Sequence, residues 1–394
     1  MSRGTAAMKT NPARRALIAI AAIAAIALSA CTEGPAGLFA SIASETPTNT
    51  NMTKAIKNSS QSFVVRLGST STYYAGIGTL WKKADTDNRW TQADTSGVSS
   101  STIFAGSAAV IGPDMYVAFF DSATGNGLGV WSYNGTIWSH VDPGFPAAGR
   151  DLRTLLVANG KLFAVTANTR TLTTEIADYS IHHLLGTTFE DTLIDSNPTI
   201  SEQPTSMAFS GGLYWFTAGD LILNGATETS FTAIGTEPPS GSAYSGVSAN
   251  GADIYISSRT GYLYHYNAGW LTAGPFNDSK GKAYSLSTPT YIAGSNVLVV
   301  GTNRIPTSST PTVDGYLEFD MTQPFATMTP TVDHGIISNA NNFDTSLTGR
   351  SVSATPLIDL GGGDFKLFAL TNNYGLWSNT YDSAEAAWQL WVRE

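Results

Sequence analysis

The stretch AVIGPDMYVAFFDSATGNGLGVWSYNGTIW, residues 109–138, contains most of a unit that recurs along the chain. An apolar strand ends at a turn at 112–114, and a second, aromatic-rich strand follows at 115–119. After a loop, a third strand begins near Gly129 and a fourth carries Trp138. Glycine permits the positive φ of tight hairpin turns, so this pattern predicts four antiparallel strands joined in sequence.

The same turn recurs, followed each time by an apolar second strand. The other copies of the turn are at 59–60, 159–160, 211–212, 250–251, 294–296 and 361–363. In the first copy, the weakest, this predicts a second strand at 62–65. The predicted fourth strands carry Trp90, Trp138, Trp270 and Trp388, with Phe189, Phe231 and Phe325 in the weaker copies.

Seven units of four strands, about 50 residues apart, predict an all-β chain folded as a β-propeller with seven four-stranded blades. The third and sixth copies are long and irregular, which leaves rings of six or eight blades open. Aromatic side chains are expected to pack one blade against the next. The first and last units each hold four strands of their own, so the sequence shows no clear exchange of strands between the termini and leaves the closure of the ring open.

Composition excludes several classes of protein. Hydrophobic residues make up 42% of the 394 residues and aromatic residues 11%, which excludes a long disordered chain. The net charge of −9 argues against a nucleic-acid-binding protein, which needs a dense basic surface. The single cysteine excludes a disulfide framework and a cysteine-rich metal site.

The first thirty residues have the pattern of a secretory signal. Four basic residues precede an apolar run at 16–29, which is shorter than the roughly 20 residues needed to cross a bilayer. The run ends in Leu28-Ser29-Ala30-Cys31, which resembles the lipobox of bacterial lipoproteins. The resemblance implies cleavage before Cys31 and attachment of a diacylglycerol to its thiol. The alternative is a chance cysteine in an ordinary secretory leader.

We therefore expect a lipoprotein signal peptide at 1–30, a flexible tether at 31–51 and the propeller domain at 52–394. Residues 32–51 are mostly Ser, Thr, Asn, Pro and Ala with little periodicity, although a strand docked on the domain is an alternative. Cleavage would leave 17 basic and 30 acidic residues, a net charge of −13. The lipid would hold the protein to the cell membrane or the outer membrane, on the extracytoplasmic side.

The sequence offers no recognisable catalytic or metal-binding motif. The five histidines lack metal-ligand spacing, and the adjacent pair His182-His183 would alternate faces of a strand, one packed and one at the surface. Calcium at Asp85 and Asp87 is an alternative to an ordinary Asp-rich turn. The predicted innermost strands at 154–158, 206–209 and 290–293 carry few ionisable groups, with Asp359 an exception. No propeller family fits in detail, and we predict no catalytic residue, metal or cofactor.

Basic residues cluster in one class of connection. In a propeller, the loops after second strands and the segments before first strands open on the same face. The basic residues predicted on that face are Arg150, Arg153, Arg170, Arg259, Arg304, Arg350, Lys280 and Lys282. One interpretation is an anion-binding surface for a carboxylated glycan or an acidic protein patch. The other is ordinary ion pairing with the acidic residues of the same loops.

The sequence thus favours a non-catalytic envelope protein that binds a protein or glycan partner through one loop face and the membrane through its lipid. A glycan hydrolase or lyase working in the central funnel is the first alternative. A structural subunit of an envelope assembly complex is the second. Propellers serve all three roles, so the fold does not decide between them.

Overall fold

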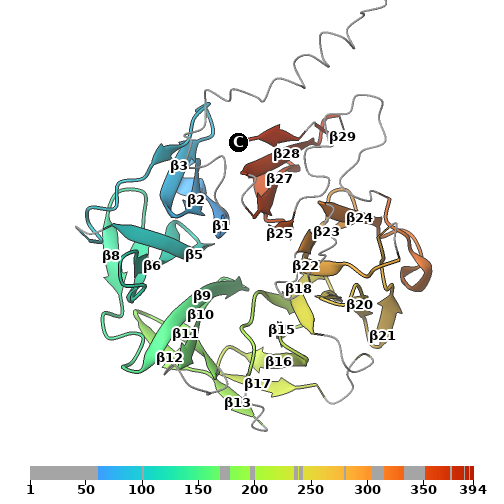
Figure 1. Cartoon of the computed structure of the whole chain (residues 1–394), viewed down its shortest axis with the longest axis horizontal. Helices are drawn as coiled ribbons and strands as arrows, with labels where there is room; N and C mark the ends of the chain where they lie inside the picture. Colours follow the sequence, from blue (N-terminus) through green and yellow to red (C-terminus); the bar gives the residue numbers. More distant parts are fainter. Residues whose placement is uncertain are drawn as a thin grey trace, which may run out of the picture. The chain divides into compact units, whose positions relative to one another are not determined.

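The computed structural model describes residues 61–99, 102–168, 178–195, 200–234, 238, 243–278, 281–303, 315–331, 351–372, 375–385, 387–389 and 391–394. These residues form seven β-sheets arranged as the blades of a β-propeller (Figure 1). The predicted fold, all-β with seven blades on a four-stranded plan, is confirmed. The predicted signal peptide and tether, with Cys31, lie outside the described residues.

Blades 1 to 3 each contain four antiparallel strands in sequence order. Their elements are β1 (Phe63–Leu67), η1 (Gly68–Thr70), β2 (Thr72–Ile77), β3 (Thr79–Ala84), β4 (Thr91–Gln92); β5 (Ile103–Ile111), β6 (Asp114–Asp121), β7 (Gly127–Tyr133), β8 (Trp138–Val141); and β9 (Arg150–Ala158), β10 (Lys161–Asn168), β11 (Tyr179–Leu185), β12 (Thr188–Asp191).

Blades 4 and 5 follow the same plan, with one addition. Their strands are β14 (Met207–Ser210), β15 (Leu213–Ala218), β16 (Leu221–Thr227), β17 (Ser230–Ala233); and β18 (Tyr244–Asn250), β19 (Asp253–Ser258), β20 (Leu263–Tyr266), β21 (Trp270–Ala273). In blade 4 the short β13 (Leu193–Asp195) pairs in parallel with the outer edge of β17.

Blades 6 and 7 are less regular. Their elements are β22 (Ser285–Ile292), β23 (Val297–Asn303), β24 (Tyr316–Asp320), η2 (Phe325–Thr327); and β25 (Val352–Ala354), β26 (Leu357–Gly361), β27 (Asp364–Thr371), β28 (Leu376–Asp382), β29 (Ala387–Trp388), β30 (Val392–Arg393). In blade 7, β25 and β26 together form the inner edge and β29 and β30 the outer edge.

Two strand predictions were wrong. Residues 62–65 are not a second strand, because Phe63–Leu67 is the innermost strand of blade 1 and its hairpin turns at η1 and Ser71, which has a φ of 47°. Phe325 lies in the short 3₁₀ helix η2 rather than in a fourth strand. Pro324 precedes it and lacks the N–H that a ladder needs, so the backbone turns there instead. Beyond η2, the Thr331 N–H donates to the carbonyl of Glu318 in β24 at 2.7 Å, so the chain returns to the outer edge of the blade.

The core lies between the blades. The buried apolar residues of the described chain form seven clusters, each drawn from two neighbouring blades. Aromatic rings dominate several of them; Tyr73 of blade 1, for example, packs edge-on against Phe368 of blade 7, with the ring centroids 5.7 Å apart. The prediction that aromatic residues pack one blade against the next is confirmed.

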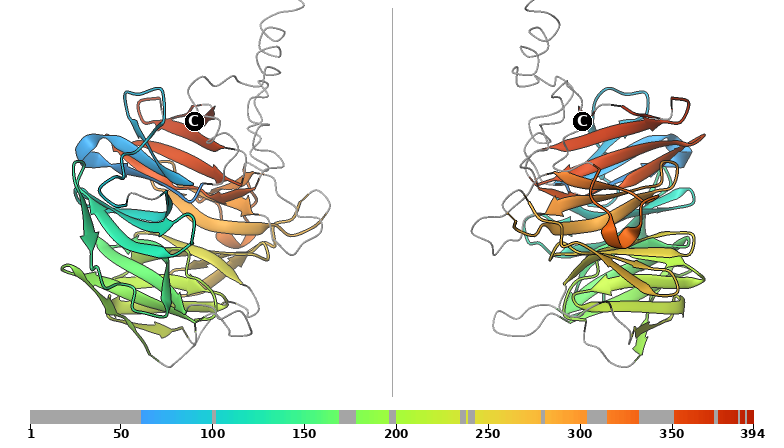
Figure 2. Two further views of the ribbon diagram at one scale, coloured as in Figure 1. Left: turned by 60° about the vertical axis from the view of Figure 1, so that its left-hand side comes forward. Right: turned by 90° about the vertical axis from the view of Figure 1, so that its right-hand side faces the viewer.

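Among the described strands, the ring closes without strand exchange. Blade 1 is built from residues 63–92 and blade 7 from residues 352–393, and the two lie side by side (Figures 1 and 2). The Thr371 N–H donates to Gln61 Oε1 at 2.8 Å across this seam. The buried Glu394 carboxylate also bridges it, with Oε2 2.5 Å from Lys83 Nζ and Oε1 2.8 Å from Lys366 Nζ. Packing, hydrogen bonds and ion pairs therefore close the ring.

Serine and threonine hydroxyls join neighbouring innermost strands. Ser107 Oγ accepts from the Leu155 N–H at 3.0 Å between blades 2 and 3. Thr290 Oγ1 donates to the Thr355 carbonyl at 2.7 Å between blades 6 and 7. Hydroxyl groups of the inner strands thus stabilise the contacts between neighbouring blades.

Candidate functional site

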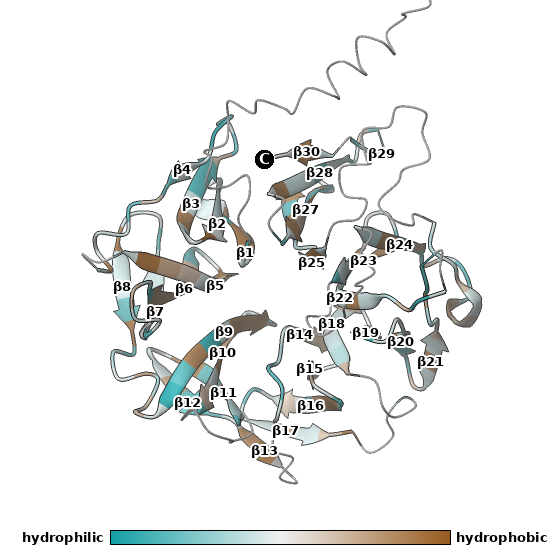
Figure 3. Cartoon of the chain, viewed as in Figure 1, coloured by the Kyte–Doolittle hydropathy of each residue, from teal (hydrophilic) through white to brown (hydrophobic). Residues whose placement is uncertain are grey.

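The innermost strands have two ends that differ in chemistry. Each runs from the connection between blades to a hairpin turn, and its second strand runs back. We call the end with these turns the hairpin face. We call the end with the inter-blade connections and the loops after second strands the loop face. In Figure 3, β9 passes from hydrophilic at its Arg150 end, on the loop face, to hydrophobic at its Ala158 end, on the hairpin face.

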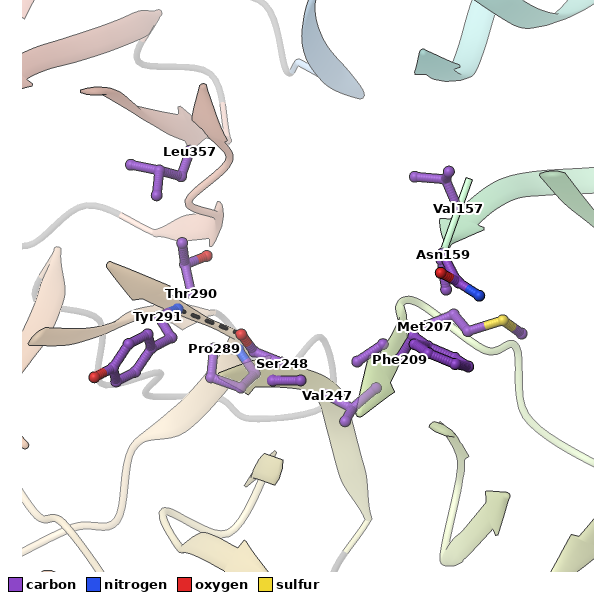
Figure 4. Close-up of a pocket in the computed structure, with 13 residues that line it drawn as sticks. Val157, Asn159, Met207, Phe209, Val247, Ser248, Pro289, Thr290, Tyr291 and Leu357 are labelled. Carbon is purple, nitrogen blue, oxygen red and sulfur yellow. Dashed lines mark hydrogen bonds between the residues drawn. The ribbon is translucent and has the colours of Figure 1, made fainter. Parts of the chain in front are cut away.

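A pocket of about 530 Å³ lies at the hairpin-face ends of the innermost strands, and Figure 4 shows side chains that line it. Residues 157–159, 207–209, 247–249 and 289–291 line it together with Leu357. These segments come from the innermost strands of five blades, and three of them overlap the strands that the sequence singled out. The described lining contains no ionisable side chain other than the Tyr291 phenol, so it offers apolar surface with a few hydroxyl and amide groups.

Asp359 stabilises its own turn. Its side chain is exposed, and its Oδ1 accepts a hydrogen bond of 2.7 Å from the Gly361 N–H. A carboxylate at position i that accepts from the backbone two residues later is a common turn device. The residue therefore has a local structural role at the hairpin face.

The loop face carries two cavities beside the seam between blades 2 and 3. One, of about 510 Å³, is lined by Phe104, Gly106, Phe120, Asp121, Ser122, Gly125, Leu152, Arg153 and Gln203, and we call it the loop-face groove. The other, of about 470 Å³, is lined by residues 126–129, His140, Pro143 and residues 145–152. Buried Leu152 lines both cavities.

A β-bulge points Arg153 into the loop-face groove. Leu152 and Thr154 pair with the consecutive residues Thr166 and Val165, so Arg153 is the extra residue of the innermost strand. Four other innermost strands carry a bulge near the same place. The extra residues there are Gly106, Ser245, Ser287 with Thr288, and Ser353. Among these bulges in the described chain, the third blade alone presents a long cationic side chain.

Arg150 is a structural residue. Its Nε donates to Thr166 Oγ1 at 2.8 Å, and its Nη2 donates to the Asp178 carbonyl at 3.1 Å. The Thr166 hydroxyl also bonds His182 Nε2 at 2.8 Å, and His182 Nδ1 lies 2.7 Å from Asp191 Oδ1. Burial lowers the pKa of His182, although Asp191 opposes the shift. Thr166 is fully buried, and this chain of bonds joins β9, β10, β11 and β12 within the blade.

Arg259 tethers the connection between blades 3 and 4. Its Nη1 lies 2.8 Å from Glu202 Oε2, and both side chains are partly exposed. The next residue, Gln203, reaches the loop-face groove, while Thr205 Oγ1 donates to the Ser245 carbonyl at 2.5 Å. The connection therefore brings residues near the start of blades 2 to 5 together on the loop face.

The remaining predicted basic residues are placed as follows. Lys282 lies in the connection before β22, where its N–H donates to Asp278 Oδ1 at 2.7 Å. Arg170, Arg304, Arg350 and Lys280 lie outside the described residues. The three described arginines of the set each pair with a carboxylate, Arg150 with Asp178, Arg153 with Asp151 and Arg259 with Glu202. Arg150 and Arg153 share a strand, whereas Arg259 belongs to blade 5.

Both histidines of the adjacent pair are buried, which corrects the prediction of one at the surface. His182 is 7% exposed and His183 3% exposed. They do alternate faces of β11, but each face of a blade is covered by a neighbouring blade. No group of three potential metal ligands occurs within the described ranges. Asp85 instead pairs with Arg66 at 2.5 Å, and Asp87 accepts from the Ala84 N–H at 3.3 Å.

The aromatic part of the groove was missed at the sequence level. Phe104 is 39% exposed, and its ring centroid lies 6.1 Å from that of Phe120. Its neighbours Ile103 and Ala105 are buried, as alternation along a strand requires. This alternation was the available signal, because it places a large apolar ring on the face opposite to Ile103 and Ala105.

Comparison with known proteins supports the fold but identifies no family. No family model and no curated protein matches the chain. In solved structures, the chain is similar to the extracellular domain of a putative hybrid two-component system from B. thetaiotaomicron, with 14% identity and a TM-score of 0.54. The match covers 83% of this chain but only 39% of that one. A computationally designed protein, Ika8, matches with 10% identity and a TM-score of 0.46, covering 82% of this chain and 97% of its own.

No helix in the described ranges is long and apolar enough to cross a membrane.

Proposed function

We propose that this protein is a lipid-anchored, extracytoplasmic binding protein that engages a protein or glycan partner through the loop face of its propeller. The loop-face groove carries the proposal, because it combines an exposed aromatic ring, a cationic side chain and an amide in a cavity of about 510 Å³. Ligand sites commonly join apolar surface with a few polar groups in a cavity of this size. The pocket on the hairpin face lacks this combination.

The anchor is proposed from the sequence around Cys31. A cysteine at the end of a short apolar leader has the features of a lipidation site, and two or more acyl chains give stable membrane attachment. The fold neighbour is an extracellular domain, which is consistent with a location outside the cytoplasm.

Fractionation of the Cys31→Ser variant tests the anchor. We expect the wild-type protein in the membrane fraction and the variant in the soluble fraction. A variant that stays membrane-bound and retains its leader would contradict lipidation at Cys31.

Binding to isolated cell envelopes tests the face. The soluble Cys31→Ser protein is compared with versions that also carry Arg153→Glu and Arg259→Glu on the loop face, or Val157→Ala on the hairpin face. We expect the loop-face charge reversals to weaken sedimentation with envelopes and Val157→Ala to leave it unchanged. The opposite ranking would place the binding surface on the hairpin face and refute the proposal.

A further inference from the structure

We infer that the loop-face groove is a saccharide subsite for a neutral sugar, with a pyranose ring stacked on Phe104 and its hydroxyls held by Arg153 and Gln203. This inference rests on the proposed function and names the chemical class of its ligand.

The apolar wall of the groove fits the face of a sugar ring. Phe104 lies near the start of β5 with 39% of its surface exposed, and Phe120 packs against it at an interplanar angle of 53°. The face of an aromatic ring is electron-rich, so it attracts the weakly positive C–H groups on the flat side of a pyranose. An exposed Phe beside a cavity is therefore a suitable stacking surface.

The polar side chains of the lining supply hydrogen-bond donors and acceptors. Arg153 makes one hydrogen bond, from Nη2 to Asp151 Oδ2 at 3.3 Å, and guanidinium carries five N–H groups. The Gln203 side chain lines the groove and makes no hydrogen bond to another described residue. A sugar hydroxyl both donates and accepts, so it can accept from Arg153 while it donates to the Gln203 carbonyl oxygen.

The local charge favours a neutral sugar over an acidic one. Arg153 is balanced by Asp151, and Asp121 adds a second carboxylate to the lining. Asp121 Oδ1 accepts from the Thr124 N–H and hydroxyl at 2.8 and 3.0 Å, which holds this carboxylate in the loop after β6. A uronate would bring its own negative charge toward these two, and like charges repel. Hydroxyl groups meet no such penalty.

The backbone keeps the groove open. A Cβ on Gly106 would lie 2.5 Å from Phe120 Cε2, so glycine at this bulge leaves room for the second ring. The bulge leaves Arg153 unpaired in the backbone ladder, and its side chain lines the cavity. Bulges often re-aim side chains at binding sites.

The test uses the Cys31→Ser protein and immobilised oligosaccharides. The probes are neutral gluco-, galacto- and manno-oligosaccharides and, for comparison, oligogalacturonate. The variants are Phe104→Ala, Arg153→Ala and Gln203→Ala. Val157→Ala is the matched control, because Val157 is 40% exposed on β9, the strand that also carries Arg153, but lines the hairpin-face pocket.

We expect a neutral probe to bind, Phe104→Ala and Arg153→Ala each to weaken binding about tenfold, Gln203→Ala to weaken it less, and Val157→Ala to leave it unchanged. Binding of oligogalacturonate alone, or of no probe, would overturn the inference. Neutral binding that survives Phe104→Ala would also overturn it. If envelope binding still depends on the loop face in these cases, the proposed function stands and only its saccharide assignment fails.

Discussion

The two ends of the innermost strands, one at the hairpin face and one at the loop face, differ in chemistry. At the hairpin face, the ends of these strands in blades 3 to 7 line a pocket of apolar groups with a few hydroxyl and amide groups. At the loop face, blades 2 and 3 carry Phe104, Arg153 and a cavity that joins them. The strand β9 contains both kinds of surface, with Arg150, Asp151 and Arg153 at its start and Leu-Leu-Val-Ala at its end. The side chains at the loop face therefore depend on the bulge and the inter-blade connection of each individual blade.

Both faces exist only while the ring is closed. We expect the largest effect on stability from a substitution at the seam between blades 1 and 7. Glu394 is 5% exposed and contacts Lys83, Lys366 and Ser378. Glu394→Gln removes the charge that both lysines face, so we expect the free energy of unfolding to fall by about 3 kcal/mol. Denaturant unfolding measures this. The exposed Glu385→Gln is the control and is expected to change stability by less than about 0.5 kcal/mol.

The same carboxylate predicts a pH dependence. Burial would raise the pKa of Glu394, but the charges of Lys366 and Lys83 outweigh it and lower the pKa to about 2 from 4.5. A depressed carboxyl pKa contributes stability above the unfolded-state pKa, and this contribution is lost as the pH falls toward the folded-state value. We expect the wild type to lose roughly 3 kcal/mol between about pH 5 and pH 2 through this group. Equal acid sensitivity in Glu394→Gln would show that the seam does not depend on this ionisation.

Two glycines, one near each end of the innermost strand of blade 2, are required for different reasons: Gly106 for space and Gly112 for its backbone conformation. Gly106→Ala at the loop face puts a Cβ against the Phe120 ring. We expect the free energy of unfolding to fall by about 2 kcal/mol and the loop-face groove to become narrower. At the hairpin face, the Cβ of Gly112→Ala would meet no atom within 4 Å, but the residue must adopt a φ of 57°. We expect the free energy of unfolding to fall by about 1 kcal/mol. Only the first substitution should weaken ligand binding. Thermal unfolding and binding assays on both variants would show whether this separation holds.

Removing a hydroxyl group that bonds neighbouring blades should lower stability by a smaller amount, similar at both ends of the strands. Ser107→Ala removes a group that accepts from the Leu155 N–H, and Thr290→Val removes a donor to the Thr355 carbonyl. We expect each to cost about 1 kcal/mol of stability and neither to change binding. A change in ligand affinity with Thr290→Val, which lines the hairpin-face pocket, would assign that pocket a role in binding.

The smallest expected effect on stability comes from Arg153→Ala. Its ion pair with Asp151 is exposed on both sides, at 37% and 41%, and such pairs contribute little. We expect stability to change by less than about 0.5 kcal/mol while ligand affinity falls about tenfold. A large loss of stability in equilibrium unfolding would instead identify Arg153 as a structural residue like Arg150.

Periodicity predicted the architecture because every blade repeats the same demands. Turns at 112–114 and 159–160, for example, need positive φ, and the strands between them need apolar faces on both sides. Prediction failed where a blade departs from the repeat. The turn after β1 contains a single glycine, Gly68, followed by Ser-Thr-Ser, and Pro324 replaces the start of a fourth strand.

The candidate site was harder to predict, because its residues come from different blades. Arg153 was singled out by its place before the core of β9, and pairing with the acidic residues of the same connections was one of the two interpretations. The bulge that re-aims Arg153 was not identified. Gln203 lies about fifty residues away along the chain in an inter-blade connection, and no local pattern links it to Phe104. Contacts between blades depend on the assembled ring, which periodicity alone does not specify.

Hydrogen–deuterium exchange on the Cys31→Ser protein, with and without isolated cell envelopes, tests the central claim most directly. We predict protection of backbone amides around the loop-face groove, in residues 103–106, 121–125 and 200–205. The hairpin turns at 159–160, 211–212 and 294–296 should be unaffected. Protection confined to those turns would contradict the account and identify the hairpin face as the binding surface.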